Sequence, residues 1–425
     1  MAGLFVHRAG RAEASAAALA DVLRAGASDD PIHPVAVAVG SRGMERWLRH
    51  RLARLLGVVA NLSFPFPAAL LAEALGMSAA DAAWRPEAMT WRVLRWLDDG
   101  SDTSPGAGGP TPMDVAARRD AAEGTPERAP LMRWLETRRV TAGADGTRMP
   151  HGVIDRDRYT LARELADILD RVALFRPTWT IGFERHEALD ADALPHDPRF
   201  AWLAPAWRAV ADGVGPPPPR QLALAKPAPG APLHIFGVVS MPPLWWQAWA
   251  RVAEVRDVHL FPILPTDAYI GDHRTRAELR RASRRDAATP SGAGERVQTW
   301  TEVAEQHPLL TALGRTTRDA VEAYLDAEAH EIDVVDPSAE EGGESVDGEG
   351  DRLLAWLQRD LREAVGGETL ASRRAERRWS PADDSLEVHG CHGPTRQVEV
   401  LRDVLLRLFQ QHPHLEPRDV LILTP

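Results

Sequence analysis

Leu386-Glu387-Val388-His389 is the stretch on which the expected fold depends, because it predicts a strand that leads through a loop into a helix. The loop covers residues 390–396, and a helical pattern follows over 397–411, with apolar residues at spacings of three and four. Val420-Leu421-Ile422-Leu423 then predicts a second, buried strand. This order is typical of a parallel sheet, so we predict an α/β fold. We expect a longer protein, because an α/β unit begins at residue 386 and the chain stops at 425.

The same alternation occurs earlier in the chain. Strands are predicted at residues 4–6, 34–39, 233–239 and 258–263, and helices at 13–24, 43–56, 160–174 and 243–255. We therefore expect a parallel-sheet domain from 1–75 with 230–330, an inserted helical domain at 78–225, a linker and helix at 331–385, and the beginning of a second α/β domain at 386–425.

Composition limits the class of protein. The 425 residues and 44% hydrophobic content suit two or three domains. No run of 18 uncharged apolar residues and no basic leader exist, so we expect neither a membrane span nor a signal peptide. Cys391 is the only cysteine, which excludes an internal disulfide and paired-cysteine metal sites and suits a cytoplasmic location.

Charge gives a mixed indication about nucleic acid. The net charge of −11 argues against indiscriminate binding. Lys226 is the only lysine among 50 basic residues, so almost every basic contact is a forked guanidinium suited to phosphate or guanine. Six arginines between 274 and 285 are interpreted as part of a solvated loop.

Two loops, of which the first follows a predicted strand, are candidate contacts for DNA. Gly40-Ser41-Arg42-Gly43 precedes a helix, where backbone N–H groups and Arg42 could hold a phosphate, with Arg46 on the polar side of the helix. Phe66 follows Phe64-Pro65 and could stack on a base. An ordinary turn with a solvated arginine face, and a buried loop anchor, remain open alternatives.

Two helical segments carry further candidates. The helix over 160–174 places Asp167 and Asp170 opposite its predicted buried face, with Arg171 at the flank and Arg176 beyond its end. That buried face is predicted to consist of Leu161, Leu165, Ile168, Leu169 and Val172. Aspartate accepts from the cytosine amino group and arginine binds guanine or phosphate, although solvated salt bridges explain the same pattern. In the tail, His392 and Arg396 lie where a phosphate could dock at a helix start, unless Thr395 simply caps that helix.

Several segments, in order and at similar spacings, resemble the RecC family, the gamma subunit of exodeoxyribonuclease V. The resemblance covers nearly the whole chain and is carried by Gly43-Met44 with Trp47-Leu48, Ala60-Asn61 followed by Phe64-Pro65-Phe66-Pro67, Met89-Thr90-Trp91, Asp170 with Phe175-Arg176-Pro177 and Trp179, Phe236-Gly237 with Pro242-Pro243, Pro308-Leu309-Leu310 with Gly314-Arg315 and Arg318-Asp319, His392, Pro394 and Arg396 with Val398-Glu399-Val400-Leu401, and Pro417-Arg418-Asp419.

The resemblance implies a superfamily 1 helicase-like fold with a decayed motor: a 1A-like sheet domain, a 1B-like helical insertion and the start of a 2A-like domain. It implies a non-motor, DNA-binding subunit of an ATP-dependent helicase–exonuclease complex in double-strand-break repair by homologous recombination. Such a subunit splits duplex ends, guides single strands and takes part in recognising Chi. RecB-like and RecD-like partners would carry the ATP and magnesium.

The family's site residues map onto some of the candidates. The loop at Arg42 would lie along the single-stranded DNA path, and Asp167, Asp170 and Arg176 correspond by position to a base-reading helix. Gly40, Arg42 and Arg46 differ from the family pattern, which has amide or hydroxyl side chains there.

The sequence itself argues against a motor or a nuclease in this chain. A working motor needs Gly-Lys-Ser/Thr after its first strand, but residues 7–13 contain no lysine and include Glu13. Lys226 lies between Ala225 and Pro227, so an Asp/Glu/Lys nuclease cluster is excluded as well. We therefore expect no cofactor on this chain. Two alternatives remain: an active superfamily 1 helicase or ATPase, and a protein-interaction scaffold without DNA contacts.

Overall fold

The computed structural model describes residues 2–26, 34–77, 82–99, 130–131, 134, 156–185, 200–275, 277–280, 305–334 and 352–423. Its fold is α/β with a parallel sheet, as the alternation of strands and helices predicts. Within these residues the sheet has six strands in the order β3-β2-β4-β5-β1-β6. The strands are β1 Leu4–Arg8, β2 Val35–Val39, β3 Leu62–Ser63, β4 Leu233–Phe236, β5 Val258–Phe261 and β6 His330–Asp333.

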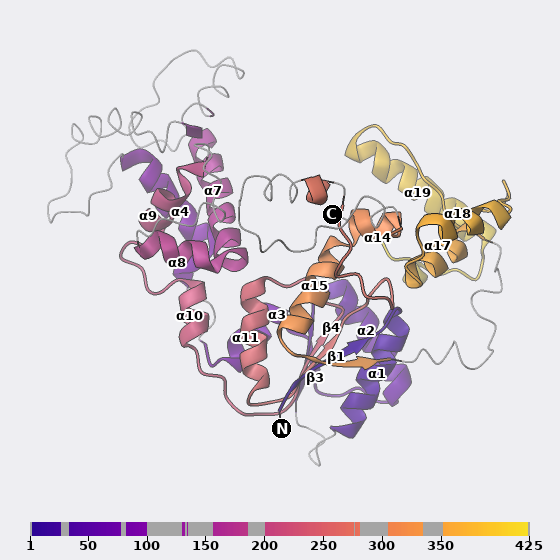
Figure 1. Cartoon of the computed structure of the whole chain (residues 1–425), viewed down its shortest axis with the longest axis horizontal. Coiled ribbons are helices and arrows are strands. Elements are labelled where there is room, and N and C mark those ends of the chain that lie inside the picture. Colours follow the sequence, from indigo (N-terminus) through magenta and orange to yellow (C-terminus); the bar gives the residue numbers. More distant parts are fainter. Residues whose placement is uncertain are drawn as a thin grey trace, which may run out of the picture.

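Helices cover both faces of the sheet, as expected for parallel strands (Figure 1). On one face, α1 (Ala12–Ala25) and α2 (Arg42–Leu56) bury Leu19, Leu48 and Leu52 against Phe236 and Phe261. The other face is covered by α3 (Pro67–Ala74), α11 (Pro243–Ala253) and α15 (Arg315–Asp326). Alternate residues of β2 therefore face different cores, with Ala38 in one and Val37 and Val39 in the other.

The described chain between α3 and β4 forms a helical bundle with its own core. Trp207 is fully buried at its centre, beside Trp84. Ile168, predicted to be buried, is 40% exposed, because the buried stripe runs through Leu161, Leu165 and Leu169 instead. The helices are α4 (Pro86–Asp99), α7 (Arg156–Phe175), α8 (Pro177–Arg185), α9 (Leu203–Ala211) and α10 (Pro218–Leu224).

Two strand predictions in the last part of the chain are wrong. Residues 386–389 and 420–423 form no strand, and Leu421 and Leu423 are exposed. A strand is stable only when a neighbour satisfies its backbone N–H and C=O groups, and no described segment pairs with either stretch. The helix between them does form, as α19 (Gly393–Gln411). It is preceded by α14 (Pro308–Leu313), α17 (Leu353–Arg362) and α18 (Gly367–Glu376).

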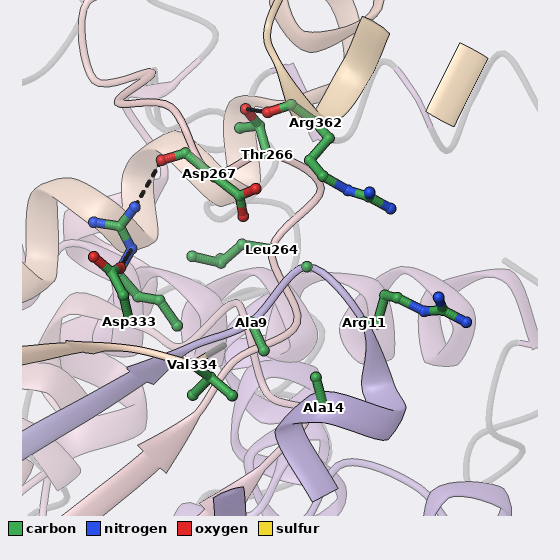
Figure 2. A pocket seen from close by; sticks show the side chains of 11 residues that line it. Ala9, Arg11, Ala14, Leu264, Thr266, Asp267, Asp333, Val334 and Arg362 are labelled. Carbon is green, nitrogen blue, oxygen red and sulfur yellow. Dashed lines mark hydrogen bonds and ion pairs between the residues drawn. The ribbon is translucent and has the colours of Figure 1, made fainter. Parts of the chain in front are cut away.

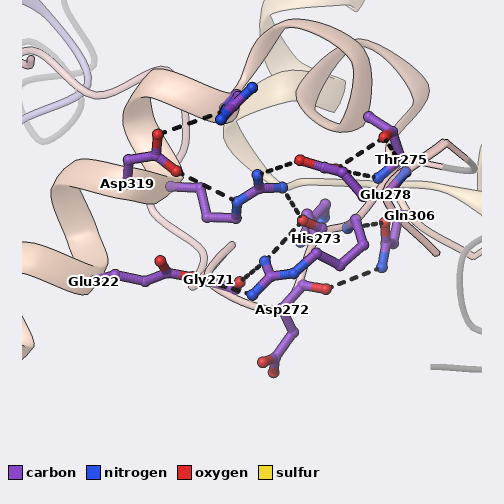
Figure 3. A network of polar contacts seen from close by, with 11 residues as sticks. Gly271, Asp272, His273, Thr275, Glu278, Gln306, Asp319 and Glu322 are labelled. Atoms are coloured by element: carbon purple, nitrogen blue, oxygen red, sulfur yellow. Dashed lines mark hydrogen bonds and ion pairs between the residues drawn. The ribbon is translucent and has the colours of Figure 1, made fainter. Parts of the chain in front are cut away.

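A polar network fixes the segment that follows β5 against α15 (Figure 3). The buried Arg318 donates to the carbonyl of His273 and to Glu278, at 2.8 Å from its Oε1. Hydrogen bonds from Arg318 and Thr275 lower the pKa of Glu278 to about 2, against the opposing effect of burial. Arg274 bonds Glu322 at 3.2 Å, so it connects two segments of the fold and is not part of a solvated loop. Arg276, Arg281, Arg284 and Arg285 lie outside the described residues.

The described residues lack two features that would bear on function. None of the helices in these ranges combines the length and the apolar character needed to cross a bilayer. Nor do these residues contain a cluster of three or more histidine, cysteine, aspartate or glutamate side chains placed to hold a metal ion.

Candidate nucleic-acid interface

The carboxyl ends of β1, β5 and β6 meet at a pocket of about 330 Å³ (Figure 2). β1 leads into α1, which covers one face of the sheet. β5 leads through α14 to α15, and α15 covers the opposite face. This is a topological switch point, where open α/β sheets bind ligands. The side chains at this edge therefore determine whether the pocket can bind a nucleotide.

The residues in this pocket do not fit magnesium-ATP. Arg8 is already bonded to Glu331 at 2.7 Å, to Asp333 at 3.5 Å and to the backbone carbonyl of Asp267 at 2.8 Å. The carboxylates of Asp267 and Asp333 also line the pocket and would repel phosphates. No lysine or magnesium-binding hydroxyl precedes α1, whose N-cap is Arg11. We assign no step of ATP chemistry to this pocket.

The structure brings Arg42 and Phe66 together beyond the ends of β2 and β3. The Arg42 guanidinium lies 5.6 Å from the centre of the Phe66 ring, a cation–π contact. Phe66 is 48% exposed, so it is no buried anchor, whereas Phe64 is buried beneath Arg49. The exposed ring and guanidinium form a surface suited to a base and its phosphate.

Local hydrogen bonds fix the start of α2. Ser41 caps the helix by accepting from the backbone N–H of Met44 at 3.1 Å. Glu45 bonds both Arg42, at 2.7 Å, and Arg49, at 3.1 Å, and these arginines lower the pKa of Glu45. Arg46 is exposed and makes no ion pair with any other described residue. The turn is thus an ordinary capped helix start, and it also carries guanidinium side chains that are exposed to solvent.

Helix α7 places its candidates on a different part of the molecule. Asp170 is half-buried, and burial, followed by the charge of Asp167, raises its pKa. Arg171 is exposed and opposes that shift. Arg176, beyond the helix end, lies 6.0 Å from the ring of Trp179. The carboxylates therefore have Arg171 near them but are not paired with Arg176, which lies apart beyond the helix end.

The tail candidates lie at the exposed start of α19. His392 is its N-cap without a side-chain cap bond, and Arg396 pairs with Glu399 at 2.9 Å. Thr395 lies inside the first turn, so the alternative prediction that it caps the helix is wrong. No hydrogen bond, ion pair or ring contact in the described residues joins the Arg42, Asp170 and Arg396 groups. In Figure 1, α7 and α19 lie on opposite sides of the view.

Sequence reasoning overlooked an arginine group on α17 and α18, although Arg373-Arg374 and Arg377-Arg378-Trp379 were visible signals. Arg373 and Arg377 both bond the buried carboxylate of Asp360. They line a second hollow, together with Arg359, Glu376 and Arg378.

Fold and site together define a parallel α/β protein with arginine-rich loops and a strand-end pocket that lacks the groups for ATP hydrolysis. A family model described as RecC, N-terminal domain, matches residues 4–364. The chain therefore belongs to the RecC family, as the sequence resemblance indicated.

Curated relatives agree with this membership. The chain is 32% identical to RecBCD enzyme subunit RecC of Mycobacterium tuberculosis, over 99% of this chain and 34% of that protein. The subunit of the same name from Mycolicibacterium smegmatis is 30% identical, over 99% of this chain and 33% of its own length. That of Escherichia coli is 26% identical, over 93% and 34%. The chain thus spans about a third of the length of these relatives.

Proposed function

We propose that the chain is the DNA-guiding part of a non-motor subunit in a RecBCD-type helicase–nuclease that acts in DNA repair and recombination. Family membership supports this role, since the relatives carry the name RecBCD enzyme subunit RecC. The observation that carries it is the exposed Arg42–Phe66 pair beyond the ends of β2 and β3.

A single strand crossing this edge would meet two kinds of contact. A base would stack on the open part of the Phe66 ring, and a phosphate would approach Arg42, whose side chain is 76% exposed. Arg46 extends the same positive surface along α2. These contacts tolerate any sequence, because every base has a stacking face, so they guide a strand without reading it.

Recognition of a particular base is assigned to α7. The raised pKa of Asp170 reflects partial burial beside Asp167, and a carboxylate placed this way accepts from a cytosine amino group when a base displaces water. Arg171 and Arg176 would hold the backbone or a guanine nearby. His392 and Arg396 at the start of α19 provide a further phosphate contact. Recognition of a Chi-type sequence would therefore rest on α7, and duplex splitting on the subunit as a whole.

The proposed fold is that of a superfamily 1 helicase whose motor is lost. The strand-end pocket supports this interpretation, since Arg8 is held by carboxylates where a phosphate loop would follow the first strand. RecB-like and RecD-like partners would supply ATP hydrolysis and nuclease activity. The complex would act on double-stranded DNA ends and on single-stranded DNA. We do not propose an active ATPase in this chain.

A scaffold function is the second candidate. It is favoured by apolar residues on the surface of the last segment: Val398 and Leu406 on α19 and Leu421 beyond it are each more than half exposed. Such a surface is typical of a protein contact. Under this alternative, variants of Phe66 would leave DNA binding unchanged.

Binding of a fluorescent single-stranded oligonucleotide to the full-length protein with its partners tests the proposal. Phe66→Leu should weaken binding about fivefold or more, because one stacked base contributes roughly 1–3 kcal/mol. Arg42→Gln should lower the slope of log affinity against log salt by about 0.7, the value for one single-strand phosphate contact. Phe200→Leu, at an aromatic residue that is 41% exposed in the helical bundle, is the matched control. Unchanged binding in both variants would refute the assignment.

A further inference from the structure

The hairpin formed by α17 and α18 is a positively charged segment of an acidic protein. Residues 352–380 contain seven arginines and four acidic residues, whereas the whole chain carries a net charge of −11. None of the candidate contacts considered above lies on this hairpin. Its charge therefore needs a separate explanation.

The arginines line a surface hollow of about 430 Å³. Four guanidinium side chains and one carboxylate form its wall, from Arg359, Arg373, Arg377, Arg378 and Glu376. Such a wall attracts an anion and gives it forked hydrogen-bond donors.

Asp360 holds two of these side chains in place. Its carboxylate is buried and accepts from Arg373 at 3.0 Å and from both terminal nitrogens of Arg377, at 2.5 and 2.9 Å. Arg377 also lies 5.4 Å from the centre of the Trp356 ring. These contacts immobilise the floor of the hollow before any ligand arrives, which lowers the entropic cost of binding.

The hairpin is itself fixed to the rest of the fold. The backbone carbonyl of Arg362 accepts from the hydroxyl of Thr266, at 2.8 Å, beyond the end of β5. At the turn, a side-chain carbon on Gly366 would lie 2.1 Å from the carbonyl oxygen of Glu305, so the two backbones are in close contact. The hollow therefore keeps a defined position relative to the sheet edge.

Two of the four arginines that line the hollow are exposed to solvent. Arg359 and Arg378 are exposed, and neither forms an ion pair within the described part of the chain. Trp379 follows directly and is 60% exposed. Arginines beside an open aromatic ring are the combination that binds single-stranded nucleic acid, since phosphates meet the charges and a base stacks on the ring.

We propose that this hairpin is a second single-stranded DNA contact, with Arg359 and Arg378 on phosphates, Trp379 stacked on a base and Asp360 as a positioning residue. The inference rests on the proposed function in that the subunit meets DNA, but it uses other residues. The rival occupant is an acidic segment of a partner protein, which the charges alone would also attract. The exposed tryptophan favours DNA.

The test uses the full-length protein in its complex and a fluorescent oligothymidylate. Trp379→Leu should weaken binding about fivefold or more. The double variant Arg359→Gln/Arg378→Gln should lower the salt slope by about 1.4, for two phosphate contacts. Arg402→Gln, at an exposed arginine on α19, is the matched control and should change neither quantity.

Phe66→Leu, measured in parallel, separates this inference from the proposed function. If Phe66→Leu weakens binding and the hairpin variants do not, the hairpin contact is wrong and the proposed function stands. If only the hairpin variants weaken binding, the hairpin contact holds and the Phe66 path is wrong. If the hairpin variants lose a partner subunit on co-purification while DNA affinity is unchanged, the surface binds protein and the inference is overturned.

Discussion

Lowering the pH from 7.5 to 5.0 should destabilise the sheet, because three histidines lie side by side across its centre. His7 on β1 and His259 on β5 have ring nitrogens 3.1 Å apart, and the ring of His234 on β4 stacks on His259 at 5.7 Å between centres. Burial, followed by the charge of His259, lowers the pKa values of His7 and His234 to about 4. Both rings are therefore neutral in the folded protein near pH 7.

The sign and size of the effect follow from proton linkage. A histidine that ionises near 6.5 when unfolded and at about 4 when folded binds a proton preferentially in the unfolded state, so it lowers stability as the pH falls below 6.5. At pH 5.0 the loss is about 2 kcal/mol for each ring, and about 4 kcal/mol for His7 and His234 if they act independently. Above pH 6.5 this loss is absent.

Urea unfolding at both pH values measures this loss. His7→Phe keeps a ring against Phe261, which His7 stacks on at 4.4 Å between centres, but it cannot take up a proton. The variant should therefore lose about 2 kcal/mol less than the parent between pH 7.5 and 5.0. Val6→Ala, at a buried residue on the opposite face of β1, should lower stability equally at both pH values. An identical pH dependence in the parent and His7→Phe would show that protonation of His7 does not destabilise the fold.

Two further predictions concern the α17–α18 hairpin. Gly366→Ala should cost about 1–3 kcal/mol in urea unfolding, because the added carbon meets the Glu305 carbonyl at 2.1 Å; Gly390→Ala, with nothing within 4 Å, should be nearly neutral, and equal effects would contradict the close contact. Asp360→Ala should cost about 2–3 kcal/mol, since it leaves Arg377 uncompensated and Arg373 paired with Glu363 alone, and hydrogen exchange should rise in α17 and α18. Unchanged exchange there would show that Asp360 does not hold the hairpin.

The elements that the sequence predicted correctly are those with strong apolar patterns. β1, β2, β4 and β5 are buried, and the helices α1, α2 and α11 have apolar stripes that their patterns reveal. Strands β3 and β6 escaped prediction, because Leu62–Ser63 is only two residues long and His330–Asp333 is polar and exposed. Conversely, residues 420–423 are apolar but have no strand beside them, so an apolar run alone was insufficient.

The candidate site was also predicted only in part: the sequence identified single residues but not the contacts between them. The sequence identified Arg42 and Phe66 separately, but only the parallel pairing of β2 with β3 brings residues 24 positions apart into contact. The hollow on α17 and α18 depends on Asp360 drawing in Arg373 and Arg377 from the next helix, a long-range contact that no local pattern contains. The charged and aromatic residues could be identified from the sequence. Which of them lie close together could be seen only in the folded structure.

In the proposed complex, a single DNA strand passes over the Arg42–Phe66 edge. Cross-linking of a photoreactive single-stranded or forked oligonucleotide to the full-length protein in its complex, followed by mass spectrometry, tests it most directly. Cross-linked peptides should be found around Arg42 and Phe66, with others around Asp170 and Arg396. Cross-links confined to partner subunits, with none in these segments, would contradict it.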